Sequence, residues 1–417
     1  MKRAIACALA AALSGCAMVG PDYRRPAVEL PGAYSEAAPA QTAALAVPAD
    51  WWKTYNDPLL NDLVAAGLAG NSDVRLAAAR VEEAEAALRE ANALFFPEID
   101  GSATAGRSRV STRTGIVPAS IPAIRTNYAL TATTTFELDF WGRLRRAAEA
   151  ARAQYFATQY GRDIVALTLA AGVAQTYFAV RSLDAQILVS QETLQAADES
   201  LDIARKRFQA GLVSELDVNQ AAANRAQLAA QITDLKRQRA TAVHQIGVLT
   251  GRLDVKLDAG DLRALPTPPL PPAGLPSTLL ERRPDVRQAE SQLAAATALI
   301  GVARAAQFPT FSLTGSLGRQ SKELETLFNA GGGLWNIGLN IAGPIFDAGR
   351  YAARTQQAEA RAHQAAATYE KTARTAFREV SDALSNVGYA ADAEKDLQER
   401  VDQARNSLKL ATMRYDS

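Results

Sequence analysis

Apolar positions follow a heptad pattern in residues 142–250, the longest stretch of the chain without a helix breaker. No proline occurs between Pro122 and Pro266, and alanine, leucine, glutamine, arginine and glutamate dominate, which favours helix. Two rows repeat every seven positions: Leu183, Ser190, Ala197 and Ala204, and Ile187, Leu194, Leu201 and Phe208. Such rows are typical of the a and d positions of a left-handed supercoil. One helix over residues 143–210 would extend about 100 Å, so it is either a dimeric coiled-coil spacer or a wall element of a tube.

The heptad pattern breaks at Gly211. Residues 209–214, Gln-Ala-Gly-Leu-Val-Ser, predict a helix end at the glycine, a short turn and a new N-cap at Ser214. A returning helix up to Thr250 is then marked by Leu228, Ile232, Leu235, Val243, Ile246 and Leu249. The sequence therefore predicts a long helical hairpin.

A pair of strands precedes this hairpin. Phe96-Pro97 ends a helix predicted over residues 58–94, and residues 99–110 are rich in glycine, serine and threonine. Residues 128–141 alternate strictly, with Tyr128, Leu130, Ala132, Thr134, Phe136, Leu138 and Phe140 on one face and Ala129, Thr131, Thr133, Thr135, Glu137 and Asp139 on the other. An edge strand of a soluble sandwich would look similar, but aromatic ends and a polar second face fit a membrane barrel strand. The long helix that begins directly after this strand, at Gly142, favours the membrane barrel strand over the soluble edge strand.

The chain consists of two related halves separated by a proline-rich segment. Asp73-Val74-Arg75 recurs as Asp285-Val286-Arg287, and Gly142-Arg143 recurs as Gly349-Arg350. The strand pair returns as well, with Phe311, Leu313 and Leu317 alternating with Ser312, Thr314 and Ser316, and Trp335, Ile337, Leu339 and Ile341 alternating with Asn336, Gly338 and Asn340. We predict a first repeat over 58–250, an extended linker over 251–276 and a second repeat over 277–417. Because Ser417 corresponds to Ala210, the second return helix is expected to be missing through truncation.

The N-terminus is predicted to be a targeting segment. Lys2 and Arg3 precede an apolar run over residues 4–13 that is too short to span a bilayer. Leu13-Ser14-Gly15-Cys16 resembles the bacterial lipobox, whose cysteine carries a covalent lipid, although an ordinary signal peptide with an incidental cysteine is the alternative. We predict a signal peptide over 1–15, lipidation of Cys16, sorting to the outer membrane and an extended arm over 16–57.

Composition and motifs argue against an enzyme or a nucleic-acid-binding protein. The 417 residues include 45 basic and 44 acidic residues, so no charge excess attracts nucleic acid. His244 and His363 are isolated on helices, and no HExxH motif or phosphate-binding glycine loop is present. We expect no metal and no cofactor besides the lipid. The apolar run 164–180 is interrupted by polar residues, which favours a packed helix over a transmembrane one.

Four membrane-type strands per chain cannot stand alone in a bilayer, because open sheet edges would leave backbone groups unpaired. Single-chain barrels have about eight strands or more, so strands from several copies must combine. Eight strands in a dimer would be filled by side chains, whereas twelve in a trimer leave a lumen. The threonine-rich second face favours a water-filled interior.

These features resemble the TolC/OprM family of outer membrane factors, in particular its lipoprotein (NodT-type) branch. The resemblance covers nearly the whole chain and rests on the lipobox with Gly20-Pro21-Asp22-Tyr23, on Phe140-Trp141-Gly142-Arg143, and on residues 207–218, 275–290 and 343–350. It implies an α+β membrane protein in which four strands per chain contribute to a trimeric twelve-stranded β-barrel, continuous with a periplasmic α-helical barrel. It also implies passive export, driven by an inner-membrane RND-type pump that is joined through a periplasmic adaptor.

The resemblance assigns roles to individual residues. Gly211, Leu212, Val213 and Ser214 would form the turn that docks the adaptor. Asp217 and Tyr415 match residues of the periplasmic gate, although Asp217 is equally well explained as an acid favoured in the first turn of a helix. The competing hypothesis for the whole chain is a lipid-anchored coiled-coil scaffold without channel activity.

Overall fold

The computed structural model describes residues 18–35, 48–111, 122–266 and 278–416. These residues form two compact units, each assembled from both halves of the sequence. The first unit contains the described residues up to Val28 together with Glu82–Thr158 and Arg287–Thr372. The second contains Glu29–Val81, Gln159–Val286 and Ala373–Ser417 as far as they are described. Cys16 lies outside the described residues.

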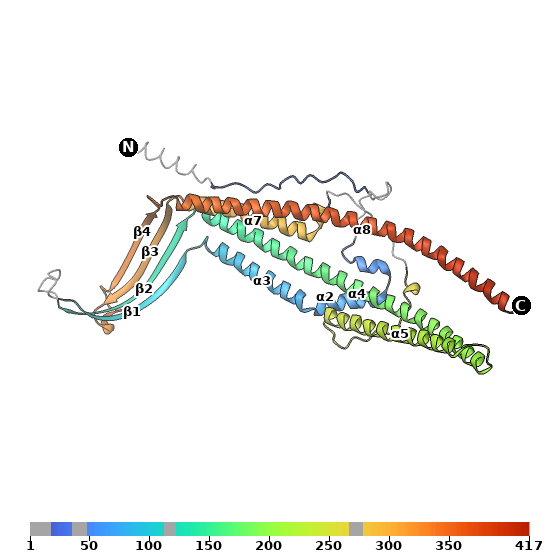
Figure 1. The fold of residues 1–417 in the computed structure, drawn as a ribbon. Coiled ribbons are helices and arrows are strands. Elements are labelled where there is room, and N and C mark those ends of the chain that lie inside the picture. Colours follow the sequence, from blue (N-terminus) through green and yellow to red (C-terminus); the bar gives the residue numbers. More distant parts are fainter. Residues whose placement is uncertain (1–17, 36–47, 112–121, 267–277, 417) are drawn as a thin grey trace. The chain divides into compact units, whose positions relative to one another are not determined.

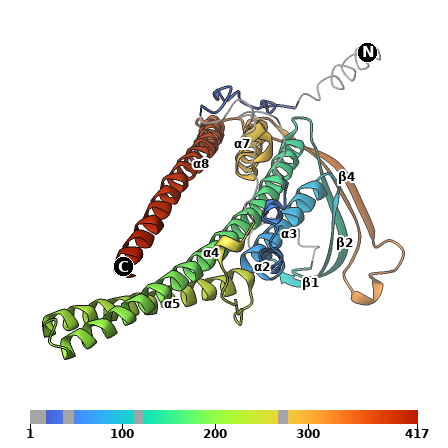
Figure 2. The same cartoon turned by 90° about the vertical axis from the view of Figure 1, so that its right-hand side faces the viewer.

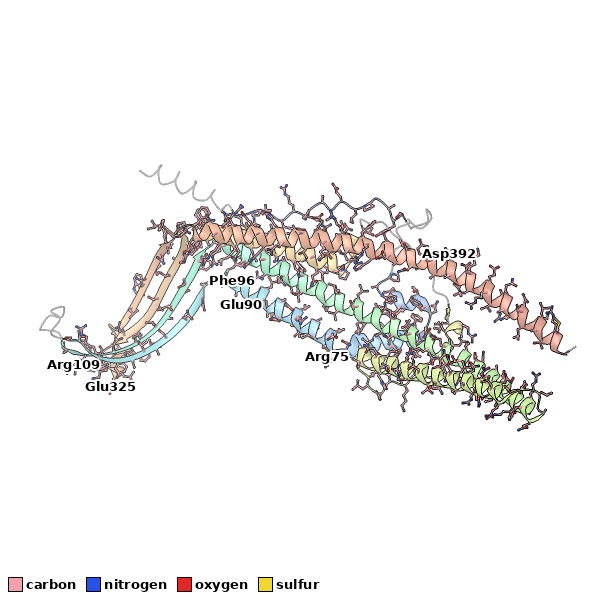
Figure 3. All side chains as sticks on the ribbon, viewed as in Figure 1. Arg75, Glu90, Phe96, Arg109, Glu325 and Asp392 are labelled. Carbon is pink, nitrogen blue, oxygen red and sulfur yellow. The ribbon has the colours of Figure 1, made fainter. Side chains whose placement is uncertain are left out.

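The first unit is built around a four-stranded antiparallel sheet. Strands β1 (Glu98–Arg109), β2 (Ile124–Leu138), β3 (Thr310–Ser321) and β4 (Gly333–Ala342) lie side by side in chain order (Figure 1). The two halves of the sequence meet where β2 pairs with β3. β1 and β4 are the edge strands. Figure 3 shows Arg109 and Glu325 near one end of the sheet and Phe96 at the other end, where the helices begin.

The helix predicted over residues 58–94 is two helices, α2 (Pro58–Gly70) and α3 (Ser72–Ala93). The break is at Asn71, which has an extended backbone. The Asn71 side chain accepts hydrogen bonds from the backbone N–H groups of Asp73 (2.7 Å) and Val74 and donates to the Leu249 carbonyl (3.0 Å). The helix α2 therefore ends at Gly70, and the Asn71 side chain caps the start of a new helix.

The predicted helical hairpin is observed as α4 (Arg143–Gln209) and α5 (Glu215–Thr250), which lie side by side in Figure 2. Of the two heptad rows, Ala197 and Leu201 are buried, and Phe208 at the far end is exposed. Ion pairs join the helices at Asp198–Arg225 (2.8 Å) and at Asp184–Arg239. The heptad pattern thus predicted the face through which α4 packs.

The apolar run in α4 belongs to the core of the second unit. Leu169, Ala170, Val173, Ala174, Tyr177 and Val180 pack with residues of α2, with Ile246 of α5 and with Leu257. Among the described residues, α4 is the one helix long and apolar enough to cross a membrane by length and composition, with a window of mean hydropathy 1.5. Its place in the core supports the prediction of a packed helix.

The second half repeats the element order of the first, with α7 (Pro284–Ala305), β3, β4 and α8 (Arg350–Asp416). Shorter elements are the 3-10 helices η2 (Trp51–Tyr55), η3 (Leu262–Ala264) and η5 (Leu324–Thr326), and the single turn α6 (Leu279–Arg282). In the segment after α5, the Leu257 carbonyl accepts from Arg239 and the Asp258 carbonyl accepts from Arg181. This part of the predicted linker is therefore fixed to α4 and α5.

Candidate functional site

The sheet has one apolar and one polar face, because residues paired across the strands fall on the same side. The register places Ile99, Leu130, Phe136, Phe311, Leu313, Leu317, Trp335, Ile337, Leu339 and Ile341 on one face. Leu317, Trp335 and Ile337 are 68%, 75% and 72% exposed. A contiguous exposed apolar surface of this kind marks contact with a membrane or with another protein.

The opposite face is polar along all four strands. It carries Asp100, Ser102, Thr131, Thr133, Thr135, Ser312, Thr314, Ser316, Asn336 and Asn340. Ser102 and Thr131 are joined by a hydrogen bond of 2.7 Å between their hydroxyls. The alternation predicted from the sequence is therefore confirmed on all three strands for which it was stated, and it continues on β1.

A fixed joint connects β2 to α4. The Arg143 guanidinium donates two hydrogen bonds to Glu137, at 2.9 and 2.6 Å. Asp139 accepts from the backbone N–H groups of Leu144 (3.1 Å) and Arg145 (3.0 Å) and so caps the first turn of the helix. Residues 139–141 were predicted to continue the strand, but β2 ends at Leu138 because Asp139 serves the helix instead.

The joint between β4 and α8 also contains an aspartate that caps the helix. Asp347 accepts from the backbone N–H groups of Gly349 (3.0 Å) and Tyr351 (2.8 Å). These bonds favour the charged carboxylate, so they hold the pKa of Asp347 below its ordinary value. Gly349 has a positive φ of 83°, as Gly142 has at the first joint.

The N-terminal arm is attached to the first unit by two charged clusters. Arg146, whose side chain is 2% exposed, donates to Asp22 at 2.7 Å. Arg25 binds Glu290 through two hydrogen bonds of 2.7 and 3.0 Å, and Tyr23 donates to the same carboxylate at 3.2 Å. Burial and the Glu290 charge raise the pKa of the Tyr23 phenol. The Gly-Pro-Asp-Tyr motif thus fastens the arm, and the sequence pointed to the motif but not to its partners.

The first described residues of the arm, Met18 and Val19, lie against the β2–α4 joint. The Val19 N–H donates to the Trp141 carbonyl at 3.1 Å. A Cβ atom at Gly142 would lie 2.3 Å from the Met18 side chain, and the φ of Gly142 is +76°. Both the close approach and the backbone conformation therefore require glycine at position 142.

The turn between α4 and α5 has the predicted geometry. Gly211 has φ +73°, and the Leu212 N–H donates to the Arg207 carbonyl at 2.8 Å, as in a Schellman motif. The Ser214 backbone N–H (2.8 Å) and hydroxyl (2.7 Å) both donate to Asp217. These bonds lower the pKa of Asp217. Leu212, the residue after Gly211 in the turn, is 73% exposed.

Of the two predicted gate residues, the structure describes the side chain of Asp217 but not that of Tyr415. Asp217 makes the helix-capping contacts expected of an acid in the first turn. Tyr415 falls within α8, and its side chain is outside the described part of the chain. Their roles in a gate, and those of residues 211–214 in docking, stay predictions.

A buried polar cluster in the second unit had no signal in the sequence. Tyr177 donates to Asp57 at 2.5 Å, Arg181 donates to the Tyr177 hydroxyl at 3.1 Å, and Asp184 bridges Arg181 and Arg239. The five residues come from three separate segments, so their meeting depends on how α2, α4 and α5 pack. The contacts are mutual, which indicates a structural role. No group of three or more acidic, histidine or cysteine side chains that could hold a metal ion occurs among the described residues.

The chain matches known proteins along most of its length. The family described as Outer membrane efflux protein matches residues 63–252 and 275–417. The solvent efflux pump outer membrane protein SrpC of Pseudomonas putida is 37% identical over 411 residues, covering 97% of this chain and 87% of the relative. The cation efflux system protein CusC of Escherichia coli O6:H1 (strain CFT073) is 34% identical over 381 residues, covering 90% and 81%.

Solved structures agree with this assignment. The outer-membrane channel OprN superimposes with a TM-score of 0.85 at 31% identity, covering 95% of this chain and 89% of that one. The open-state MtrE outer membrane channel of Neisseria gonorrhoeae gives a TM-score of 0.81 at 28% identity, covering 96% and 89%. The predicted TolC-like fold class is confirmed, and the scaffold hypothesis finds no support. The chain belongs to the outer membrane efflux protein family, a family of transport proteins located in the outer membrane.

Proposed function

We propose that three copies of this chain form one tube across the outer membrane and that this tube is the passive exit duct of a tripartite efflux pump. The two-faced sheet carries the proposal. Its apolar face is exposed, while its edge strands β1 and β4 have open backbone edges among the described residues. A bilayer requires these edges to be paired. Three copies supply twelve strands, enough to leave a lumen, and the hydroxyl and amide side chains of the polar face would line it.

We further propose that the tube is closed and docked at its helical end. The turn of residues 211–214 offers an exposed apolar side chain, Leu212, to a periplasmic adaptor, which links the duct to an inner-membrane RND-type pump. Asp217 and Tyr415 are proposed as gate residues. A ring of three Asp217 carboxylates would favour cations near the constriction.

The chain is proposed to be held to the outer membrane lipid in two ways. The sheet inserts through its apolar face, and a covalent lipid on Cys16 anchors the start of the mature chain at the beginning of the arm. The division into a signal peptide (1–15), an arm (16–57), two repeats (58–250 and 277–417) and a linker (251–276) belongs to the same proposal. We expect Cys16→Ala to weaken anchoring while channel formation persists, measured as membrane residence and trimer content. Loss of the protein from the membrane would contradict this.

The cargo is proposed to be small molecules that the pump selects. The relatives named above are a solvent efflux protein and a cation efflux protein, so chains of this kind serve chemically unlike cargo. Neutral hydroxyl and amide groups dominate the polar face, which suits a duct without strong selection of its own.

Purified protein in planar bilayers tests the proposal. We expect detergent-extracted, heat-modifiable trimers that conduct ions, and cells that lack the protein should become more sensitive to toxic small molecules when its pump is present. A protein that is extracted from membranes by carbonate and shows no conductance would overturn the proposal in favour of the scaffold.

A further inference from the structure

The helical end of the sheet is uneven. β1 begins at Glu98, which is paired with Thr135, so Phe136, Glu137 and Leu138 of β2 extend beyond it. β3 and β4 continue further, since Leu138 is paired with Phe311 and the last pair is Thr310 with Ala342. The β1 edge is therefore short at this end, and the β4 edge is long.

An apolar pocket lies beside the β2 residues that extend beyond β1. Its volume is about 220 Å³, and its apolar walls are Phe95, Phe136, Leu138, Phe140 and Leu144. Phe140 is held by an edge-to-face contact with Phe311, with ring centroids 5.0 Å apart. The two acids at the rim, Glu137 and Asp139, are paired with Arg143 and Arg145. The pocket is thus shaped and neutralised for an apolar side chain.

The opposite edge of the same sheet carries an apolar projection. Ile345 and Phe346, between β4 and α8, are 104% and 88% exposed. The segment is held on both sides, because Gly343 packs against Pro309 and Asp347 caps α8. Two large apolar side chains on an anchored segment in full contact with solvent cost free energy unless something covers them.

We propose that Ile345 and Phe346 of one copy insert into the pocket of the adjacent copy. The inference rests on the proposed trimer. When a sheet of tilted strands closes into a barrel, its stagger accumulates in one direction around the ring. The long β4 edge of each copy then lies beside the short β1 edge of the next, which brings the projection to the pocket. Both surfaces belong to the first unit and lie at the same end of the sheet.

Disulfide cross-linking tests the contact. The double variant Phe346→Cys with Phe136→Cys should give dimers and trimers on non-reducing gels, since a disulfide needs Cα atoms within about 7 Å. In the matched control, Phe346→Cys with Tyr128→Cys, the second cysteine is on the same face of β2 but about 27 Å further along the strand. This control should not cross-link. The single variants control for Cys7 and Cys16.

Photo-cross-linking tests the same contact if the double cysteine variant does not fold. Benzoylphenylalanine at position 346 keeps an aromatic group there, and irradiation should couple it to a neighbouring copy within residues 136–144. Native mass spectrometry of the unmodified protein reports the trimer separately. Intact trimers without either cross-link would overturn the contact and leave the trimer standing, with an acyl chain as the occupant if lipid is coupled instead. Absence of trimers would overturn both proposals.

Discussion

Ile337→Arg is the substitution that most directly tests the assignment of the apolar face. Ile337 lies midway along the exposed apolar row of β4, between Trp335 and Leu339. Its register partner on β3 is Gly315, so no side chain opposite could pair with an introduced guanidinium. The matched control is Asn336→Arg, one residue earlier on the same strand and on the polar face.

The expected magnitude depends on what covers the apolar face. An arginine facing lipid near the midplane costs about 2–4 kcal/mol, and the cost falls to about 0–1 near the interfaces. At 1.4 kcal/mol per tenfold change, this is a factor of about 30–700 in the folded equilibrium of each copy. Facing water, either substitution would change stability by about 0.5 kcal/mol or less. The two variants share the backbone and strand-propensity effects of arginine. The difference between their losses of stability therefore reports the cost of placing the guanidinium against lipid.

Urea titration of folding into phospholipid vesicles, followed by heat-modifiable gel mobility, measures this difference. We expect Ile337→Arg to lower the unfolding midpoint strongly and Asn336→Arg to change it little. Equal midpoints for the two variants would refute the assignment of the apolar face to lipid, and a larger loss for Asn336→Arg would mean that the faces are inverted.

Three further outcomes follow from the structure. Gly142→Ala should destabilise the protein by about 1–3 kcal/mol because of its positive φ and the clash with Met18, seen as a lower melting temperature; an unchanged melting temperature would speak against the joint. Tyr177→Phe should cost about 1–3 kcal/mol by leaving the buried Asp57 short of a donor, measured by denaturant unfolding, and a neutral result would mean that Asp57 is hydrated. The depressed pKa of Asp217 means that its cap is complete above the ordinary carboxyl pKa and is lost as pH falls through the lowered value. Proteolysis at the turn should therefore increase only in strong acid, and Asp217→Asn should remove that pH dependence.

Much of the fold could be predicted because its elements have long, simple periods. Alternation along β2, β3 and β4 identified the faces of the sheet before the register was known, and the heptads of α4 identified its packing face. The Gly211–Ser214 turn could also be predicted, because a helix-ending glycine and an N-cap serine act on residues next to them in the sequence. The single helix predicted across Asn71 was wrong, because Gly70 followed by the capping residue Asn71 ends one helix and starts the next.

By itself, the sequence determined the kinds of element, their order and the two-sided character of the sheet, since these follow from local propensity and periodicity. Only the tertiary structure decided that Asp22 meets Arg146 and that Arg25 meets Glu290, or that Asp57 joins Tyr177. These partners lie more than a hundred positions apart and have no shared period. Their pairing is set by which segments pack together in three dimensions, and no local pattern in the sequence encodes that packing.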